Sequence, residues 1–158
     1  MTSKFQLIET FLAAASPFFY TLLLSVFYDS KRDKIHIKDV SGQILQELVE
    51  YLYTSKIPPI TEDNIQNILG AADMLQLDGV IERCDDFLKM KLKSSNCLFT
   101  YALADRYRPY ELKESALTLI KKEFAALTLS EDCLALSSEH LTNIISSENV
   151  VVSEEQIV

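Results

Sequence analysis

The sequence predicts a mostly α-helical α+β fold, in which a short strand is followed by a series of helices. Apolar residues recur at three- and four-residue steps along most of the chain, which is the pattern of amphipathic helices. One segment, KIHIKDV at 34–40, alternates apolar and polar residues loosely, as a half-buried strand does. With 158 residues and 48% hydrophobic content, the chain can bury one core, or one core with a helical extension.

The first element is an apolar stretch, Thr10 to Tyr28, which carries no charge and is long enough to cross a bilayer as a helix. Near its centre, Ser16 can cap a new helix that has Pro17 in its first position. No basic cluster flanks either end closely, and the small residues Ala13 to Ala15 precede most of the apolar run, unlike those of a signal peptide. We therefore expect two short helices rather than a membrane span.

The helices after the strand have recognisable starts and stops. Ser41 is an expected N-cap for an amphipathic helix over 44–52, Pro58-Pro59 interrupt the chain, and Thr61 can cap the next helix. Gly79 is expected to close the turn that follows. Further helices are predicted over 80–92, 95–107 and 112–127, and shorter ones around 134–136 and 141–145. No repeat or low-complexity linker separates these elements, so a domain boundary near Lys93 has to be tight.

Composition and motifs disfavour several classes of function. A net charge of −8 opposes binding to phosphate backbones, and no nucleotide-binding or other cofactor motif occurs, since the three glycines are far apart. Cys84, Cys97 and Cys133 form no CxxC pair and lie in apolar helical patterns, as reduced thiols of a cytosolic protein do. His36 and His140 are about a hundred residues apart and belong to no catalytic or metal-binding motif. We therefore expect no enzyme activity, no cofactor and no metal site.

Several motifs in family order resemble the BTB domain and the start of the BACK domain of the Kelch-like proteins. The resemblance implies a partial BTB/POZ fold, a short sheet with helices, over residues 1–92, and the N-terminal part of a helical BACK domain over 93–158. It covers about 150 residues. The motifs are FLAAASPFF at 11–19, DSKRDKIHIKDV at 29–40, YLYTSKI at 51–57, DNIQNILGAADMLQL at 63–77, CDDFLKMKLKSSNCL at 84–98, ALADRYRPYELKESALTLIKKEF at 102–124 and LSSEHLTNIISSENVVVSEEQIV at 136–158.

The N-terminus departs from the family pattern. The family has two strands and a stretch resembling F-x-A-H-R before its first helix, whereas this chain has Leu7-Ile8-Glu9 where Ala-His-Arg would stand. Loss of these strands would leave an apolar strand edge around 35–37 unpaired. A truncated fragment, a splice form or an unusual gene model is the expected explanation. No Kelch repeat occurs within the 158 residues, so we do not expect this sequence to encode the domain that would select a substrate.

The resemblance implies an adaptor role, as the substrate-recognition subunit of a cullin-3 RING E3 ubiquitin ligase. The cullin contact of the family, a hydrophobic-x-Glu motif, falls on Phe27-Tyr28-Asp29, and Leu23 and Tyr53 align with other positions of the cullin face. Asp29 is one methylene shorter than Glu, and a lost charge-assisted hydrogen bond costs about 1.5–3 kcal/mol, or roughly ten- to a hundredfold in affinity. The alternative is that Leu23 and Phe27 are packing residues and Tyr53 covers the core at a helix end.

The expected partners are cullin-3, a second copy of the chain in a homodimer, and a protein substrate bound through an absent domain. Nucleic acid and membranes are not expected partners, and the expected location is cytoplasmic, with the nucleus as a second compartment. A different class of function stays open: a BTB oligomerisation module of a cytoskeletal or transcription-regulating protein without a ligase role. A third interpretation is a partial product that binds partners without presenting a substrate.

Overall fold

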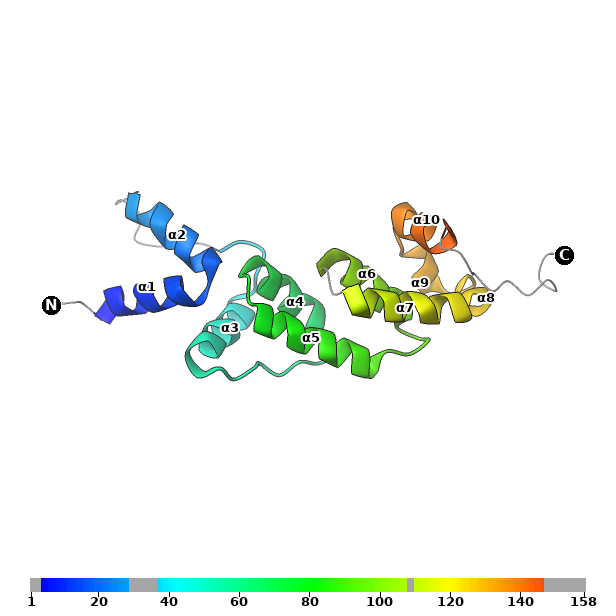
Figure 1. The fold of residues 1–158 in the computed structure, drawn as a ribbon, viewed down its shortest axis with the longest axis horizontal. Helices are drawn as coiled ribbons and strands as arrows, with labels where there is room; N and C mark the ends of the chain where they lie inside the picture. The colour runs from blue at the N-terminus through cyan, green and yellow to red at the C-terminus, as the bar shows by residue number, and fades with distance from the viewer. Residues whose placement is uncertain (1–3, 29–36, 108–109, 147–158) are drawn as a thin grey trace. The chain divides into compact units, whose positions relative to one another are not determined.

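In the computed structural model, residues 4–28, 37–107 and 110–146 are described, and the chain divides into two units, residues 1–84 and 85–158 (Figure 1). All regular secondary structure in the described ranges is helical, which confirms the prediction of a mostly α-helical chain. The helices are α1 (Lys4–Ala15), α2 (Pro17–Tyr28), α3 (Gly42–Thr54), α4 (Ile65–Met74), α5 (Asp78–Lys91), α6 (Cys97–Tyr107), α7 (Tyr110–Lys122), α8 (Phe124–Leu127), α9 (Glu131–Leu134) and α10 (Ser138–Ser146).

The predicted strand is not found where its segment is described. Lys34 to His36 lie outside the described residues, and Ile37 to Val40 form no strand. Asp39 has a φ of 66°, in the left-handed region, which interrupts an extended backbone and turns the chain toward α3. An alternating pattern is not sufficient to predict a strand, because a strand is stable only when a neighbouring strand pairs with it.

The long apolar stretch divides as predicted at Ser16-Pro17. The helix α1 ends at Ala15, and α2 begins with Pro17 in its first position. The Ser16 hydroxyl donates a hydrogen bond of 2.6 Å to the carbonyl oxygen of Leu75, and Ser16 is fully buried. α1 already begins at Lys4, so the residues just before FLAAASP are helical. Within the described ranges, no helix has the length and apolar character needed to cross a bilayer.

The helix α3 has the predicted cap, and α4 follows a turn that Thr61 organises. The Ser41 hydroxyl accepts a hydrogen bond of 3.3 Å from the Ile44 N–H at the start of α3. Thr61 and Asn64 exchange two hydrogen bonds: the Thr61 N–H donates to Asn64 Oδ1 at 2.8 Å, and the Asn64 N–H donates to Thr61 Oγ1 at 3.3 Å. This is the reciprocal pattern of a capping box across residues 61–64, so Thr61 organises the turn before α4, while the residue directly before the helix is Asn64.

The prediction that Gly79 closes the turn after α4 is wrong. Gln76 adopts the left-handed conformation there, with a φ of 56°, whereas Gly79 is the second residue of α5 and has no positive φ. Its missing side chain instead leaves room for Tyr51, because a Cβ at Gly79 would lie 2.5 Å from the Tyr51 hydroxyl oxygen. Gly79 therefore permits a close approach between α5 and α3.

The first unit has a core built mainly from α3, α4 and the first half of α5. Leu48 of α3 is completely buried among these residues, and α3 and α4 pack against each other. The apolar residues of α4 that recur at three- and four-residue steps, Ile65, Ile68, Leu69 and Ala72, are all buried. The buried apolar residues of this unit are Phe19, Leu48, Ile65, Ile68, Leu69, Ala71, Ala72, Leu75, Leu77, Val80 and Cys84.

The second unit is centred on α6 and α7, which lie side by side (Figure 1). The helix predicted over 112–127 is interrupted at Glu123, so that its last part forms the separate short helix α8. The helix α10 includes the short helix expected around 141–145, whereas α9 ends at Leu134, where the one expected around 134–136 would begin. One buried cluster joins α6, α7 and α10: Cys97, Leu98, Tyr101, Ala116, Ile120 and Ile144.

Candidate functional site

The four residues expected at the docking face are only partly described by the structure. Leu23 lies on α2 with a half-buried side chain. Phe27 follows four residues later in the same helix, on the same side, but its side chain lies outside the described residues, as does Asp29 as a whole. Tyr53 lies on another helix, in the last turn of α3.

Tyr53 is exposed and stacks on an aromatic ring of α1. Its side chain retains 47% of its accessible surface, and that of Phe11 retains 40%. The two ring centroids are 4.6 Å apart, with an angle of 13° between the ring planes, which is an offset stacked arrangement. We call these residues the aromatic pair. The pair shows that Tyr53 is not a core residue, and the second residue of the pair, Phe11, was not identified from the sequence.

The helix α2 presents further large apolar side chains at the surface. Tyr20 and Leu24, one turn apart, are both exposed, whereas Phe19 is buried. A signal for them existed in the sequence, since PFFYTLLLSVFY is apolar on every side and a helix at the surface of one core cannot bury all of its faces. Contiguous exposed apolar residues of this kind mark binding surfaces in soluble proteins.

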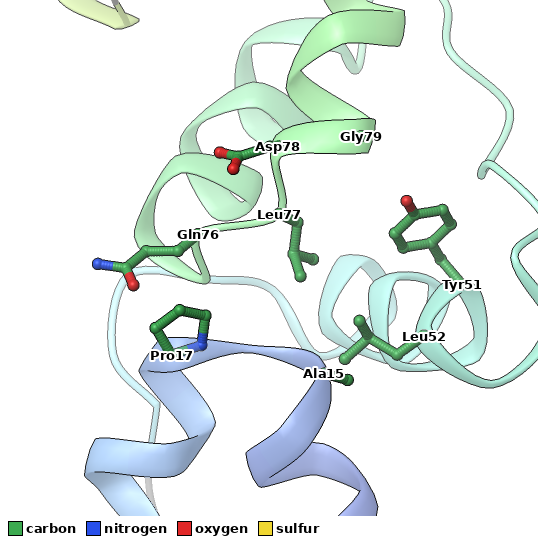
Figure 2. Close-up of a pocket in the computed structure, with 8 residues that line it drawn as sticks. All are labelled: Ala15, Pro17, Tyr51, Leu52, Gln76, Leu77, Asp78 and Gly79. Carbon is green, nitrogen blue, oxygen red and sulfur yellow. The ribbon is translucent and has the colours of Figure 1, made fainter.

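A hollow of about 480 Å³ opens beside these helices in the first unit (Figure 2). Ala15 and Pro17 contribute to it from the α1–α2 junction, Tyr51 and Leu52 from α3, and residues 76–79 from the turn into α5. The Tyr51 hydroxyl points toward Gly79 in Figure 2. Among the described residues, the lining contains the Asp78 carboxylate and no lysine or arginine, so this part of the hollow is poorly suited to a phosphate-bearing cofactor.

The second unit contains a cluster of charged and aromatic side chains that joins three helices. Asp105 of α6 accepts a hydrogen bond from the Lys113 ammonium group of α7, and its other oxygen lies 3.0 Å from Nε2 of His140 on α10. Tyr101 is almost fully buried, its ring packs edge-on against His140 at 5.7 Å, and Lys113 Nζ lies 5.8 Å from its centroid. We call these four residues the Asp105 cluster.

The electrostatics of the Asp105 cluster are those of a structural link. The hydrogen bond from Lys113, followed by that from His140, lowers the pKa of the Asp105 carboxyl group, and Asp105 in turn raises the pKa of Lys113. His140, which belongs to no motif in the sequence, is half-buried, and its Nε2 is bound to Asp105. The hollow in the first unit does not include any of these residues.

Two of the three cysteines, Cys84 and Cys97, lack the properties of nucleophiles. Cys84 and Cys97 are fully buried free thiols, and burial raises the pKa of Cys84 to about 12 and also raises that of Cys97. Cys133 is a free thiol at a half-buried position. Within the described part of the chain, no three histidine, cysteine or acidic side chains gather as a metal site. His36 lies outside the described residues.

Comparison with known proteins identifies two domain types along the chain. Residues 2–92 match the BTB/POZ domain, and residues 97–158 match the domain described as BTB And C-terminal Kelch. Kelch-like protein 3 of Homo sapiens and of Mus musculus is 40% identical over 145 residues, and Kelch-like protein 2 of Homo sapiens is 37% identical over the same length. These alignments cover 92% of this chain and 24% of each relative, so the chain spans about a quarter of the length of the curated relatives it matches.

Proposed function

The chain belongs to the BTB/POZ family and has the BTB–BACK arrangement of the Kelch-like proteins, and from this we propose that it is a protein-interaction adaptor. More specifically, we propose that it is the BTB–BACK portion of a substrate-recognition subunit of a cullin-3 RING E3 ubiquitin ligase. Its role is then to bind proteins rather than to catalyse a reaction. The proposed boundary between the BTB and BACK regions is at residues 92 and 93, within a BTB fold that includes a short sheet.

The observation that carries the proposal is the exposed Tyr53 in a chain of this family. An aromatic ring at the surface near apolar residues is the kind of side chain that dominates the energy of a protein interface. Tyr53 stands at the end of α3 with nearly half of its surface exposed, and Leu23 of the same unit is half-buried. We propose that Leu23, Phe27, Asp29 and Tyr53 together form the cullin-binding face.

The exposed residues of α2 support a second part of the proposal, a homodimer. Tyr20 and Leu24 leave apolar surface in water, and burial of such surface against a second copy is favourable by about 25 cal/mol for each Å². Symmetric pairs are the commonest oligomers, because one surface then covers itself. A dimer through α2 would place two cullin-binding faces in one assembly.

The experiment is size-exclusion chromatography with light scattering of the purified chain, the cullin-3 N-terminal domain and their mixture. A complex with two copies of each component is the expected result. A dimer that leaves cullin-3 free would favour the alternative function, a BTB oligomerisation or scaffold module without a ligase role. A monomer that leaves cullin-3 free would contradict both parts of the proposal.

Variants locate the binding face within this experiment. Phe27→Ala combined with Asp29→Ala is expected to abolish binding to cullin-3 while the helical circular dichroism is unchanged, and Tyr53→Ala is expected to weaken binding at least tenfold. Asp29→Glu should strengthen binding, since the longer side chain restores the reach of the family motif. Leu134→Ala is the matched control, because Leu134 is an exposed apolar residue of the second unit. Equal affinities for all of these variants would contradict the assignment of the face.

A further inference from the structure

The aromatic pair joins two helices that are far apart in the sequence at the proposed cullin-binding face. Phe11 belongs to α1, and Tyr53 belongs to the last turn of α3. With ring centroids 4.6 Å apart and planes within 13° of parallel, each ring covers one face of the other. Because 40% of Phe11 and 47% of Tyr53 remain exposed, both rings also present surface to a partner.

Phe11 stacks on the Tyr53 ring close to the end of α3. The helix α3 ends one residue later at Thr54, and Ser55 turns the backbone away with a φ of 57°. An exposed side chain at a helix end samples several rotamers, and a partner that needs one of them has to order the ring when it binds. A stacked neighbour supplies that order before binding, which is the general advantage of preorganisation.

We propose that Phe11 is a positioning residue of the cullin-binding face, which holds the Tyr53 ring in the orientation that the partner needs. This inference rests on the proposed function. This role of Phe11 could not be predicted from the sequence, because Phe11 lies in a long apolar stretch whose residues are expected to pack in a core. The other described members of the proposed face, Leu23, Phe27 and Tyr53, belong to α2 and α3, so Phe11 adds α1 to it.

A double-mutant cycle on the full chain tests the coupling. The dissociation constant for the cullin-3 N-terminal domain is measured for the parent, Phe11→Ala, Tyr53→Ala and the double variant by isothermal titration calorimetry. Phe11→Ala is expected to weaken binding by about 2- to 12-fold, the range that an aromatic pair supplies. In the Tyr53→Ala background the same change should have an effect of less than about twofold, because its effect passes through Tyr53.

A conservative variant and a control separate positioning from general damage to α1. Phe11→Tyr keeps an aromatic ring on Tyr53 and should bind within about twofold of the parent, whereas Phe11→Leu, which remains apolar but cannot stack, should resemble Phe11→Ala. Leu134→Ala again serves as the control, with unchanged affinity expected. Helical circular dichroism of each variant shows whether it is folded.

Each outcome has a distinct meaning. The role of Phe11 would be overturned if Phe11→Ala and Tyr53→Ala changed the dissociation constant by independent factors that multiply in the double variant. It would also be overturned if Phe11→Leu bound as tightly as the parent. Either result would leave the proposed function intact. A folded parent chain that does not bind cullin-3 would refute the proposed function, and the inference with it. If Phe11→Ala does not fold, the comparison of Phe11→Tyr with Phe11→Leu decides.

Discussion

Ser16 shows how one small polar residue connects two parts of the first unit. Its hydroxyl lies at the junction of α1 and α2, is fully buried and donates to the carbonyl oxygen of Leu75 at 2.6 Å. The Ser16 hydroxyl oxygen also accepts a longer hydrogen bond, of 3.5 Å, from the Phe19 N–H. The Leu75 carbonyl ends α4, where backbone oxygens need partners from outside the helix. Ser16 therefore supplies a hydrogen-bond donor to the carbonyl oxygen at the end of α4, and its own buried hydroxyl group gains an acceptor.

We predict that Ser16→Ala lowers the free energy of unfolding by about 1–3 kcal/mol, because it leaves the Leu75 carbonyl oxygen without this donor in a buried site. Urea denaturation followed by circular dichroism measures the change. Ser25→Ala is the matched control, since Ser25 also donates to a backbone carbonyl but is exposed, and its effect should stay below about 0.5 kcal/mol. Equal effects of the two substitutions would contradict the importance of the Ser16 contact.

Gly79 and Tyr51 make a second residue-scale contact that can be tested. Alanine is favoured over glycine within a helix by about 0.5–1 kcal/mol, but at position 79 its Cβ would lie 2.5 Å from the Tyr51 hydroxyl oxygen. We expect Gly79→Ala alone to give little or no gain in the free energy of unfolding. In a Tyr51→Phe background, which lacks that oxygen, Gly79→Ala should raise the free energy of unfolding by the full amount of about 0.5–1 kcal/mol. Urea denaturation measures both changes. An equal gain in both backgrounds would contradict this interpretation.

At the scale of the elements, the same hydrogen-bond pattern of an asparagine side chain occurs in the turns before α4 and α6. Before α4, Asn64 accepts from the Thr61 N–H and donates to the Pro59 carbonyl, and before α6, Asn96 accepts from the Lys93 N–H and donates to the Lys91 carbonyl, all at 2.8 Å. Each asparagine side chain thus bridges the backbone of the preceding turn. Local interactions of this kind explain why helix starts were predicted well from the sequence.

The Asp105 cluster holds α6, α7 and α10 together and predicts a dependence of stability on pH. Because the folded state lowers the pKa of Asp105, its contribution is present above the ordinary carboxyl pKa of about 4 and is lost as the pH falls through the lower folded value. We expect Asp105→Asn to destabilise the chain by about 1 kcal/mol at pH 7 and much less below pH 3. Thermal denaturation across this range is the measurement.

A control separates this link from the general effect of removing a charge. Glu139→Gln makes the same carboxylate-to-amide change at an exposed position of α10. Its effect on the melting temperature should be small at both pH values. If Glu139→Gln and Asp105→Asn behave alike, the three-helix link contributes nothing measurable to stability.

At the scale of the whole molecule, the cysteines report on the two units separately. Cys84 lies in the core of the first unit and Cys97 in the core of the second, whereas Cys133 is half-buried. We predict that iodoacetamide at pH 8 modifies Cys133 in the native chain, and that Cys84 and Cys97 react only when urea opens their units, because buried protonated thiols are unreactive. Mass spectrometry of labelled peptides gives a urea midpoint for each thiol, and rapid native labelling of Cys84 or Cys97 would contradict the prediction.

Much of the architecture was predictable because its causes are local in the sequence. The break at Ser16-Pro17, the Ser41 cap and the succession of helices each depend on residues within a few positions of one another. The alternating segment was less informative, since Ile37 to Val40 forms no strand and Asp39 turns the backbone there. For the candidate site, the family motifs indicated Tyr53, and the apolar character of residues 17–28 indicated an exposed side of α2 without showing which side it is. The sequence did not indicate Phe11.

The sequence by itself determined the helical character, the order of the BTB and BACK regions and the family, because capping residues, apolar periodicity and family motifs are contiguous patterns. The tertiary structure alone decided which distant residues meet: Phe11 with Tyr53, the Ser16 hydroxyl with Leu75, and Asp105 with His140. The physical reason is that periodicity reports which side of a helix is apolar, whereas the partner of that side depends on how whole helices pack.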